Sequence, residues 1–240
     1  AKPRLFLRDD DAVADTPALR RLFGLASRHD APLLLASIPS HADKSLGLAV
    51  RATPLVTGAV HGWAPVSHAP AGRKPCELGA DRPVETVLEQ LRAGRAILAD
   101  LFDGQVSGLV VPPWNRIEAS VLARIGEAGF SGVSAHGWQG APAQVAAVNA
   151  HVDVVHWSGG RTGRDLPWVF AELARNLGKA RRRGGRAVGL LTHHLAHDEA
   201  AWTAVATVME RLEGRARWVA ADDLLAEPPE PLPAGSGDQA

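Results

Sequence analysis

The chain has 240 residues, of which 46% are hydrophobic and 22% are charged, a composition typical of a globular protein with a substantial core. Lysine plus arginine and aspartate plus glutamate number 26 each, and this balance argues against a nucleic-acid partner or an anionic membrane surface. The single cysteine, Cys76, excludes an intramolecular disulfide, and no apolar run reaches the ~18 residues of a membrane-spanning helix. We therefore expect a cytoplasmic protein, although a trimmed N-terminus would leave export open.

Short apolar runs alternate with amphipathic segments along the whole chain. Thr16 is expected to cap the first helix, with Pro17 at its first position. In chain order, the first part predicts a strand over 4–10, a helix over 16–29, a strand over 31–39, a helix end or strand over 46–53, a strand over 54–63, a helix over 83–102 and a strand over 108–114. The second part predicts a helix over 118–130, strands over 131–137 and 148–157, a helix over 166–183, a strand over 187–194, a helix over 198–214 and a strand over 216–225 that runs into a short helix.

About seven strand–helix units predict an α/β fold with a parallel sheet, closed or nearly closed into a barrel, in one domain over residues 1–227. Residues 228–240, rich in proline, glycine and acid, are expected to form a disordered tail. In such barrels the catalytic side chains gather where the strands end at their carboxyl edge. Polar residues do follow the apolar runs, namely Asp9, Asp10, Asp11, His61, Trp114, Asn115, Arg116, His136, His151, Asp153, His193 and His194.

Three consecutive aspartates end the first predicted strand. A carboxylate with two imidazoles is a common ligand set for a hydrolytic divalent metal, and the candidates are Asp10 or Asp11 with His61 and His68. A second carboxylate beside the metal could act as general base. The alternative is an acidic loop in which Asp11 or Asp15 caps the following helix.

Strand alternation would direct one of His193 and His194 into the site and the other away from it. A histidine there could protonate a leaving group, and the alternative is a buried histidine bonded to the backbone. Arg116 could anchor a carboxylate or lie on the surface as an ordinary arginine. Asp153 could orient a histidine, bind a polar substrate group or form a salt bridge.

The ordered set of motifs resembles the polysaccharide deacetylase family of carbohydrate esterases. The segments that carry the resemblance are "RDDDA" (8–12), "HGWAPVSHAP" (61–70), "VPPWN" (111–115), "HVDVVHW" (151–157) and "LLTHHLAHDEAAW" (190–202). It covers about residues 5–202 and implies a distorted (β/α)7 barrel. It also implies a hydrolase that removes an acetyl or related acyl group from a carbohydrate-type substrate. The expected cofactor is one divalent metal, with zinc as the first candidate and cobalt, nickel or manganese as alternatives, and the expected nucleophile is metal-bound water.

The first two family motifs imply that Asp10 is the general base and that Asp11 and His61 are metal ligands. The family's second metal histidine falls at Pro65, which cannot bind a metal, and His68 is the expected substitute. Val111 stands where the family has an arginine, and Arg116 is expected to take over that role.

The remaining family motifs imply a general acid and a substrate-binding surface. The general acid falls at His193, with His194 as the alternate. Because Pro65 and Val111 depart from the family pattern, a member that binds carbohydrate without turning it over stays open, as does a metal hydrolase of a small non-polysaccharide C–N substrate. The expected substrate-binding residues are Trp63, Pro113, Trp114, Asn115, Asp153 and Trp157.

Overall fold

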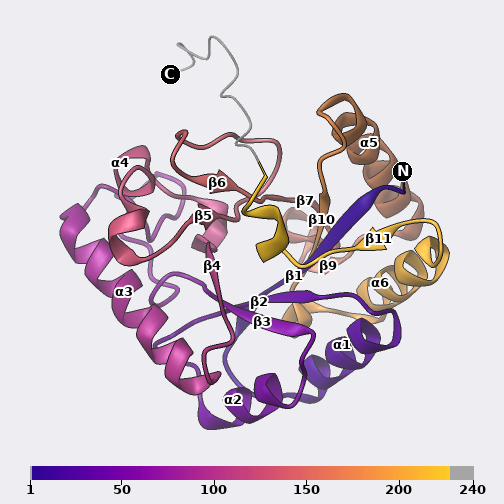
Figure 1. Ribbon diagram of the computed structural model, residues 1–240, viewed down its shortest axis with the longest axis horizontal. Coiled ribbons are helices and arrows are strands. Elements are labelled where there is room, and N and C mark those ends of the chain that lie inside the picture. Colours follow the sequence, from indigo (N-terminus) through magenta and orange to yellow (C-terminus); the bar gives the residue numbers. More distant parts are fainter. Residues whose placement is uncertain (1, 228–240) are drawn as a thin grey trace.

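Parallel strands form one strongly curled sheet at the centre of the molecule (Figure 1). The computed structural model describes residues 2–227, so the tail predicted over 228–240 lies outside the described residues. The sheet has the order β6-β5-β4-β3-β2-β1-β10-β7, and β11 pairs with β1. Its strands are β1 (Arg4–Ala12), β2 (Leu33–Ser37), β3 (Val56–Val60), β4 (Val106–Val110), β5 (Gly132–Val133), β6 (Ala146–Ala147), β7 (Ala150–Asp153), β10 (Val188–Thr192) and β11 (Arg217–Trp218).

The helices surround this sheet on its outer side, as Figure 1 shows, and the predicted distorted α/β barrel is confirmed. A bridge between His136 and Ala150 joins the chain that leaves β5 to the start of β7, so the sheet curls toward closure. Within the described residues, no helix is long and apolar enough to cross a membrane. The helices are α1 (Pro17–Arg28), α2 (Lys44–Arg51), α3 (Val84–Leu101), α4 (Ala119–Leu122), α5 (Leu166–Arg182) and α6 (Glu199–Leu212).

Local capping signals set several of the helix boundaries. The Thr16 hydroxyl accepts the backbone N–H of Leu19 and caps α1, as predicted. The segment 46–53, for which helix and strand were both open, is helical up to Arg51, where α2 ends, and Asp43 caps the N-terminus of α2 through the N–H groups of Ser45 and Leu46.

Two predicted elements are broken into shorter pieces. The helix expected over 118–130 is α4 followed by a 3-10 turn (Ile125–Ala128), and it ends at Gly129, whose φ is +85°. The strand expected over 148–157 divides into β7 and β8 (Val155–His156). β8 leaves the main sheet and pairs antiparallel with β9 (Thr162–Gly163). The break follows Asp153, whose carboxylate accepts the N–H of Val155 and turns the chain.

The two faces of β1 lie in different cores. Leu5 and Leu7 pack in the large cluster between the sheet and the helices, whereas Phe6 packs in a smaller cluster inside the curl. Because side chains alternate along a strand, Arg8 and Asp10 share the inner face with Phe6. The buried polar end of β1 therefore opens onto the interior of the barrel at its carboxyl edge.

Candidate functional site

Asp10, the predicted general base, is buried at the end of β1 and is held by a guanidinium from the same strand. Its two carboxylate oxygens accept hydrogen bonds from Nε and Nη2 of Arg8, both at 2.9 Å. Arg8 is completely buried and also donates to the carbonyl oxygens of Ser134 and Ala135 and to Asn115 Oδ1. This bidentate pair compensates the charge of Asp10 and fixes the plane of its carboxylate.

Asp11 and His61 meet at the adjacent position of the same edge. Asp11 has a φ of +74°, a strained conformation for a residue other than glycine, and its Oδ1 lies 3.3 Å from His61 Nε2. Burial opposes ionisation of both groups. The hydrogen bond and charge between them outweigh burial, so the pKa of Asp11 is lowered and the pKa of His61 is raised.

The geometry of this pair fits a cation between the two side chains. Nδ1 of His61 lies 3.0 Å from the carbonyl oxygen of Val111, so this nitrogen carries the proton. When the imidazole is neutral, Nε2 then presents its lone pair to the Asp11 carboxylate, and when it is protonated, Nε2–H faces that carboxylate. Two acceptors 3.3 Å apart require a positive charge between them, either a proton or a metal ion, and carboxylate with imidazole suits zinc and its neighbours.

The pair supplies two protein donors and not three. Among residues 2–227, no three His, Cys, Asp or Glu side chains are grouped closely enough to hold a metal ion. A divalent cation at Asp11 and His61 would therefore complete its coordination with water or substrate oxygen.

His193, the predicted general acid, lies between two carboxylates beyond the end of β10. Its Nε2 is 3.8 Å from Asp10 Oδ2, and its Nδ1 is 3.7 Å from Asp153 Oδ1. The Asp153 carboxylate is oriented by the N–H of Val155 and the indole N–H of Trp157, both at 2.9 Å. The Trp157 ring also packs edge-on against the His193 ring, with 4.7 Å between centroids. Each ring nitrogen of His193 thus has a carboxylate near it, at a distance longer than a hydrogen bond.

His194, the alternate general acid, points away from this site. Its side chain is 1% exposed, and its Nδ1 contacts the carboxylate of Asp9 on the helix side of β1. Because consecutive residues beyond β10 face opposite ways, the structure brings only His193 to Asp10.

Two further predicted residues are not brought to the site. His68 is exposed in the loop after β3, its N–H bonds to the carbonyl of Cys76, and its charged neighbours are Arg82 and Asp81. The chain from 65 to 68 runs along the surface, which carries His68 away from the metal donors. Arg116, expected to take over the role of the family arginine, donates to the carbonyl of Pro75 at 2.9 Å, and the arginine that pairs with Asp10 is Arg8.

The turn after β3 is held by a buried acid that the sequence did not suggest. Gly62 has a φ of +62°, and a Cβ there would lie 2.6 Å from the Pro113 ring, so only glycine fits. The N–H groups of Trp63 and Ala64 donate to Glu77 Oε1 at 2.7 and 2.9 Å. Glu77 is 1% exposed, and burial raises its pKa. This turn brings the predicted substrate residues Trp63 and Pro113 to the same edge of the sheet.

A cleft of about 490 Å³ opens beside the site between the loops that follow β3, β4 and β5. Asn115 and Arg116 belong to its lining, and Asn115 links the cleft to the Arg8–Asp10 pair because its Oδ1 accepts a 2.6 Å hydrogen bond from Arg8. Trp114 and Asn115 have φ values of +54° and +57°, and this strained turn leaves the Trp114 side chain 39% exposed. Of the predicted substrate residues that follow β4, Asn115 thus lines a cavity of ligand size, and Trp114 precedes it in the chain.

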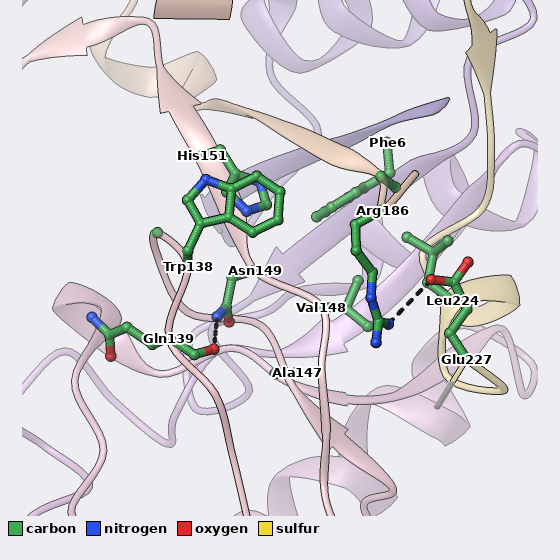
Figure 2. Close-up of a pocket in the computed structure, with 12 residues that line it drawn as sticks. Phe6, Trp138, Gln139, Ala147, Val148, Asn149, His151, Arg186, Leu224 and Glu227 are labelled. Atoms are coloured by element: carbon green, nitrogen blue, oxygen red, sulfur yellow. Dashed lines mark hydrogen bonds and ion pairs between the residues drawn. The ribbon is translucent and has the colours of Figure 1, made fainter. Parts of the chain in front are cut away.

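A separate small cavity of about 30 Å³ is lined by His151 and Trp138 (Figure 2). His151 Nδ1 accepts the N–H of Gly189 at 3.0 Å, and the Trp138 ring lies 4.0 Å away between centroids. Burial lowers the pKa of His151 to about 3, so this ring is neutral. The ion pair between Arg186 and Glu227 lines the opposite wall. His151 therefore serves the packing of β7 and β10 and not the site at His193.

Sequence reasoning missed Arg8 and Glu77. A signal for Arg8 was present, because it lies two residues before Asp10 and strand alternation places both on one face. Glu77 lies in a long loop without periodicity, and no local pattern indicated its partners.

Solved structures with the same fold confirm the architecture at low sequence identity. A family 4 carbohydrate esterase from Streptomyces lividans in complex with acetate is 14% identical, covering 92% of this chain and 99% of that chain, with a TM-score of 0.61. A family 4 acetyl xylan esterase from Clostridium thermocellum in complex with a cobalt ion is 13% identical, covering 92% of this chain and 89% of that chain, with a TM-score of 0.60. A pseudoenzyme of the same family is 13% identical, covering 94% of this chain and 68% of that chain, with a TM-score of 0.66.

No family model and no curated protein matches the sequence. The chain nevertheless has the fold of the polysaccharide deacetylases, as the motif resemblance implied. At this identity the likeness establishes the fold, and the chemistry has to be argued from the site.

Proposed function

We propose that the protein is a metal-dependent hydrolase that removes an acetyl or related acyl group from a carbohydrate-type substrate. The observation that carries this proposal is the position of the His193 imidazole, 3.8 Å from Asp10 and 3.7 Å from Asp153. A base carboxylate, an orientable imidazole and a second carboxylate on one barrel edge are the groups that acyl hydrolysis requires. The structural likeness to carbohydrate esterases supports the substrate class.

Asp10 is the general base in this mechanism. Its pairing with Arg8 fixes the plane of the carboxylate and leaves lone pairs that Arg8 does not use. As a water molecule attacks the acyl carbon, Asp10 accepts its proton, and the new C–O bond forms.

His193 is the general acid. When the bond between the acyl carbon and the leaving nitrogen or oxygen breaks, His193 donates a proton to that atom, and the acid is released as acetate or a related carboxylate. Asp153, held by Trp157, places a second carboxylate 3.7 Å from Nδ1 of this imidazole.

A divalent cation bound to Asp11 and His61 would supply Lewis-acid polarisation of the acyl carbonyl and lower the pKa of the attacking water. Zinc is the first candidate, with cobalt, nickel and manganese as alternatives. The cleft beside Asn115 offers space for the sugar, and the exposed faces of Trp114 and Trp157 are suited to stack on its ring.

Acetate release from N-acetylated chito-oligosaccharides and acetylated xylo-oligosaccharides tests this proposal, with the protein loaded in turn with each metal. We expect turnover that chelator abolishes and that Asp10→Asn and His193→Ala each lower by at least about 100-fold. Asp15→Asn, which alters an acid of the same segment paired with Arg20, is the matched control. Full activity in Asp10→Asn would exclude the mechanism.

The two-donor metal site favours one second candidate, a protein that binds acetylated carbohydrate without turning it over. Loss of the third ligand weakens metal binding, and a structural neighbour is described as a pseudoenzyme. Calorimetric binding of the same oligosaccharides with no acetate release under any metal would favour this candidate.

A further inference from the structure

Asp9, the first of the three consecutive aspartates, faces away from the proposed site. Alternation along β1 places it with Leu5 and Leu7 on the side that the helices cover, where it is completely buried. A carboxylate in such a position is costly unless hydrogen bonds and an opposite charge compensate it. Its partners therefore have to be accounted for.

The hydrogen bonds of the Asp9 carboxylate converge on the two residues that flank His193. Oδ2 accepts the Thr192 hydroxyl at 2.7 Å and the backbone N–H of His194 at 2.9 Å, and Oδ1 contacts His194 Nδ1. Asp9 is also the sheet partner of Thr192 in the pairing of β1 with β10. Asp9, Thr192 and His194, which we call the Asp9 clamp, thus fix the chain on both sides of His193.

The clamp includes a buried ion pair. Burial opposes the charge of Asp9, but the charge and hydrogen bond of His194 outweigh it and lower the pKa of Asp9. Burial likewise opposes the charge of His194, but Asp9 raises the pKa of that imidazole. A buried pair of this kind resists rearrangement, because separating it would leave each charge uncompensated.

The His193 ring makes no close hydrogen bond to either of the carboxylates that flank it. Its ring nitrogens lie 3.8 Å from Asp10 and 3.7 Å from Asp153, both longer than hydrogen bonds, and its backbone N–H reaches His197 Nε2 at 3.3 Å. The place of the ring between the two carboxylates therefore depends on the backbone that carries it.

We propose that Asp9 is a positioning residue for His193: through Thr192 and His194 it holds the turn after β10 so that the His193 imidazole stays between Asp10 and Asp153. This inference rests on the proposed function, in which His193 protonates the leaving group. It assigns separate tasks to adjacent carboxylates, since Asp10 acts on the reacting atoms and Asp9 acts through the backbone of β10.

The test compares Asp9→Asn and Thr192→Val with the wild type at a temperature well below unfolding. Each variant is assayed for kcat and KM of acetate release, for thermal unfolding and for the imidazole resonances of His193 in NMR spectra, assigned with His193→Gln. We expect kcat to fall by roughly 10-fold to 100-fold in Asp9→Asn and by less in Thr192→Val. We expect KM to change by less than about 2-fold and the His193 resonances to shift or broaden in both variants.

Ser107→Ala is the matched control. Ser107 is a fully buried strand hydroxyl like Thr192, it donates to Asp222 and accepts the N–H of Leu109, and it lies on β4. We expect this variant to lower the unfolding temperature without changing kcat or the His193 resonances. Unchanged kcat and unchanged His193 resonances in the clamp variants overturn the proposal, as does an equal loss of kcat in Ser107→Ala.

The two proposals can fail separately. If the wild type releases no acyl group from any substrate, the proposed function fails, and the His193 resonances alone decide on the clamp: a shift in Asp9→Asn supports it and no shift overturns it. If Asp9→Asn does not fold, Thr192→Val decides by the same readouts.

Discussion

The guanidinium of Arg8 donates two hydrogen bonds of 2.9 Å to the carboxylate of Asp10, two residues further along the same strand. Both side chains are buried inside the curl of the sheet, and Arg8 also binds the carbonyl oxygens that follow β5. One residue therefore ties the predicted base to the opposite wall of the barrel. Its loss should affect stability and chemistry together.

Replacing Arg8 should destabilise the fold strongly. Arg8→Met leaves Asp10 as an uncompensated buried charge, and we expect a loss of about 3–5 kcal/mol in the free energy of unfolding, measured with urea at pH 7. Arg8→Lys keeps the charge but loses the bidentate geometry, and its loss should be smaller. Arg20→Met, which removes an exposed partner of Asp15, is the control and should change stability far less. Equal losses in Arg8→Met and Arg20→Met would contradict this account.

Metal binding should depend on Asp11 and His61 and not on His68. We expect Asp11→Asn and His61→Ala to lose divalent metal, measured as metal content after dialysis and by calorimetry with zinc, while His68→Ala binds like the wild type. If His68→Ala alone abolished binding, the loop after β3 would have to close onto the site in solution.

Acid should weaken the fold through His151. Burial holds its folded pKa at about 3, below the ordinary value of 6.5, so the unfolded chain takes up the proton first as the pH falls. The stabilisation from neutral His151 is therefore fully present above pH 6.5 and is lost progressively toward pH 3. At about 1.4 kcal/mol for each pKa unit, the loss should reach a few kcal/mol.

The matched variant for this effect is His151→Asn, which keeps an acceptor for the Gly189 N–H but cannot take up a proton in this range. We expect a shallower fall of unfolding free energy between pH 6.5 and 4 than in the wild type. His41→Gln, at an exposed position, should leave the slope unchanged. A wild-type slope in His151→Asn would assign the acid sensitivity to other groups.

Removing the exposed ring beside the cleft should weaken substrate binding. Trp114 is 39% exposed on its strained turn, and Trp114→Ala should raise KM about 10-fold, with kcat changed by less than about 2-fold, because a stacking surface binds ground and transition states alike. Leu48→Ala, which truncates a side chain that is 63% exposed on α2, is the control and should leave KM unchanged. A fall in kcat at constant KM would instead place Trp114 in the chemical step.

The long periodic elements could be predicted from the sequence because their signals are local. The helix expected over 83–102 appears as α3, and the apolar run over 31–39 contains the buried strand β2. The segments 118–130 and 148–157 were predicted as single elements and are broken, since the breaks depend on turn contacts such as that of Asp153 with the N–H of Val155. The hydrophobic periodicity of a sequence carries no information about a single side-chain hydrogen bond of this kind.

By itself, the sequence determined the parallel α/β class and the edge of the sheet at which the polar residues gather. Both follow from local patterns, because hydrophobic periodicity and strand ends depend on residues that are close together in the chain. It also placed Asp10, Asp11, His61 and His193 at that edge. Only the tertiary structure decided how the charges are paired: Asp9 with His194, Asp10 with Arg8 and Asp11 with His61.

The pairing depends on two features that no local pattern contains. The strand order places β10 beside β1 and β3 one strand further along the other side, and the left-handed backbone of Asp11 departs from the alternation of the strand. Three adjacent carboxylates are accommodated there because each one has its own basic partner, His194 for Asp9, Arg8 for Asp10 and His61 for Asp11.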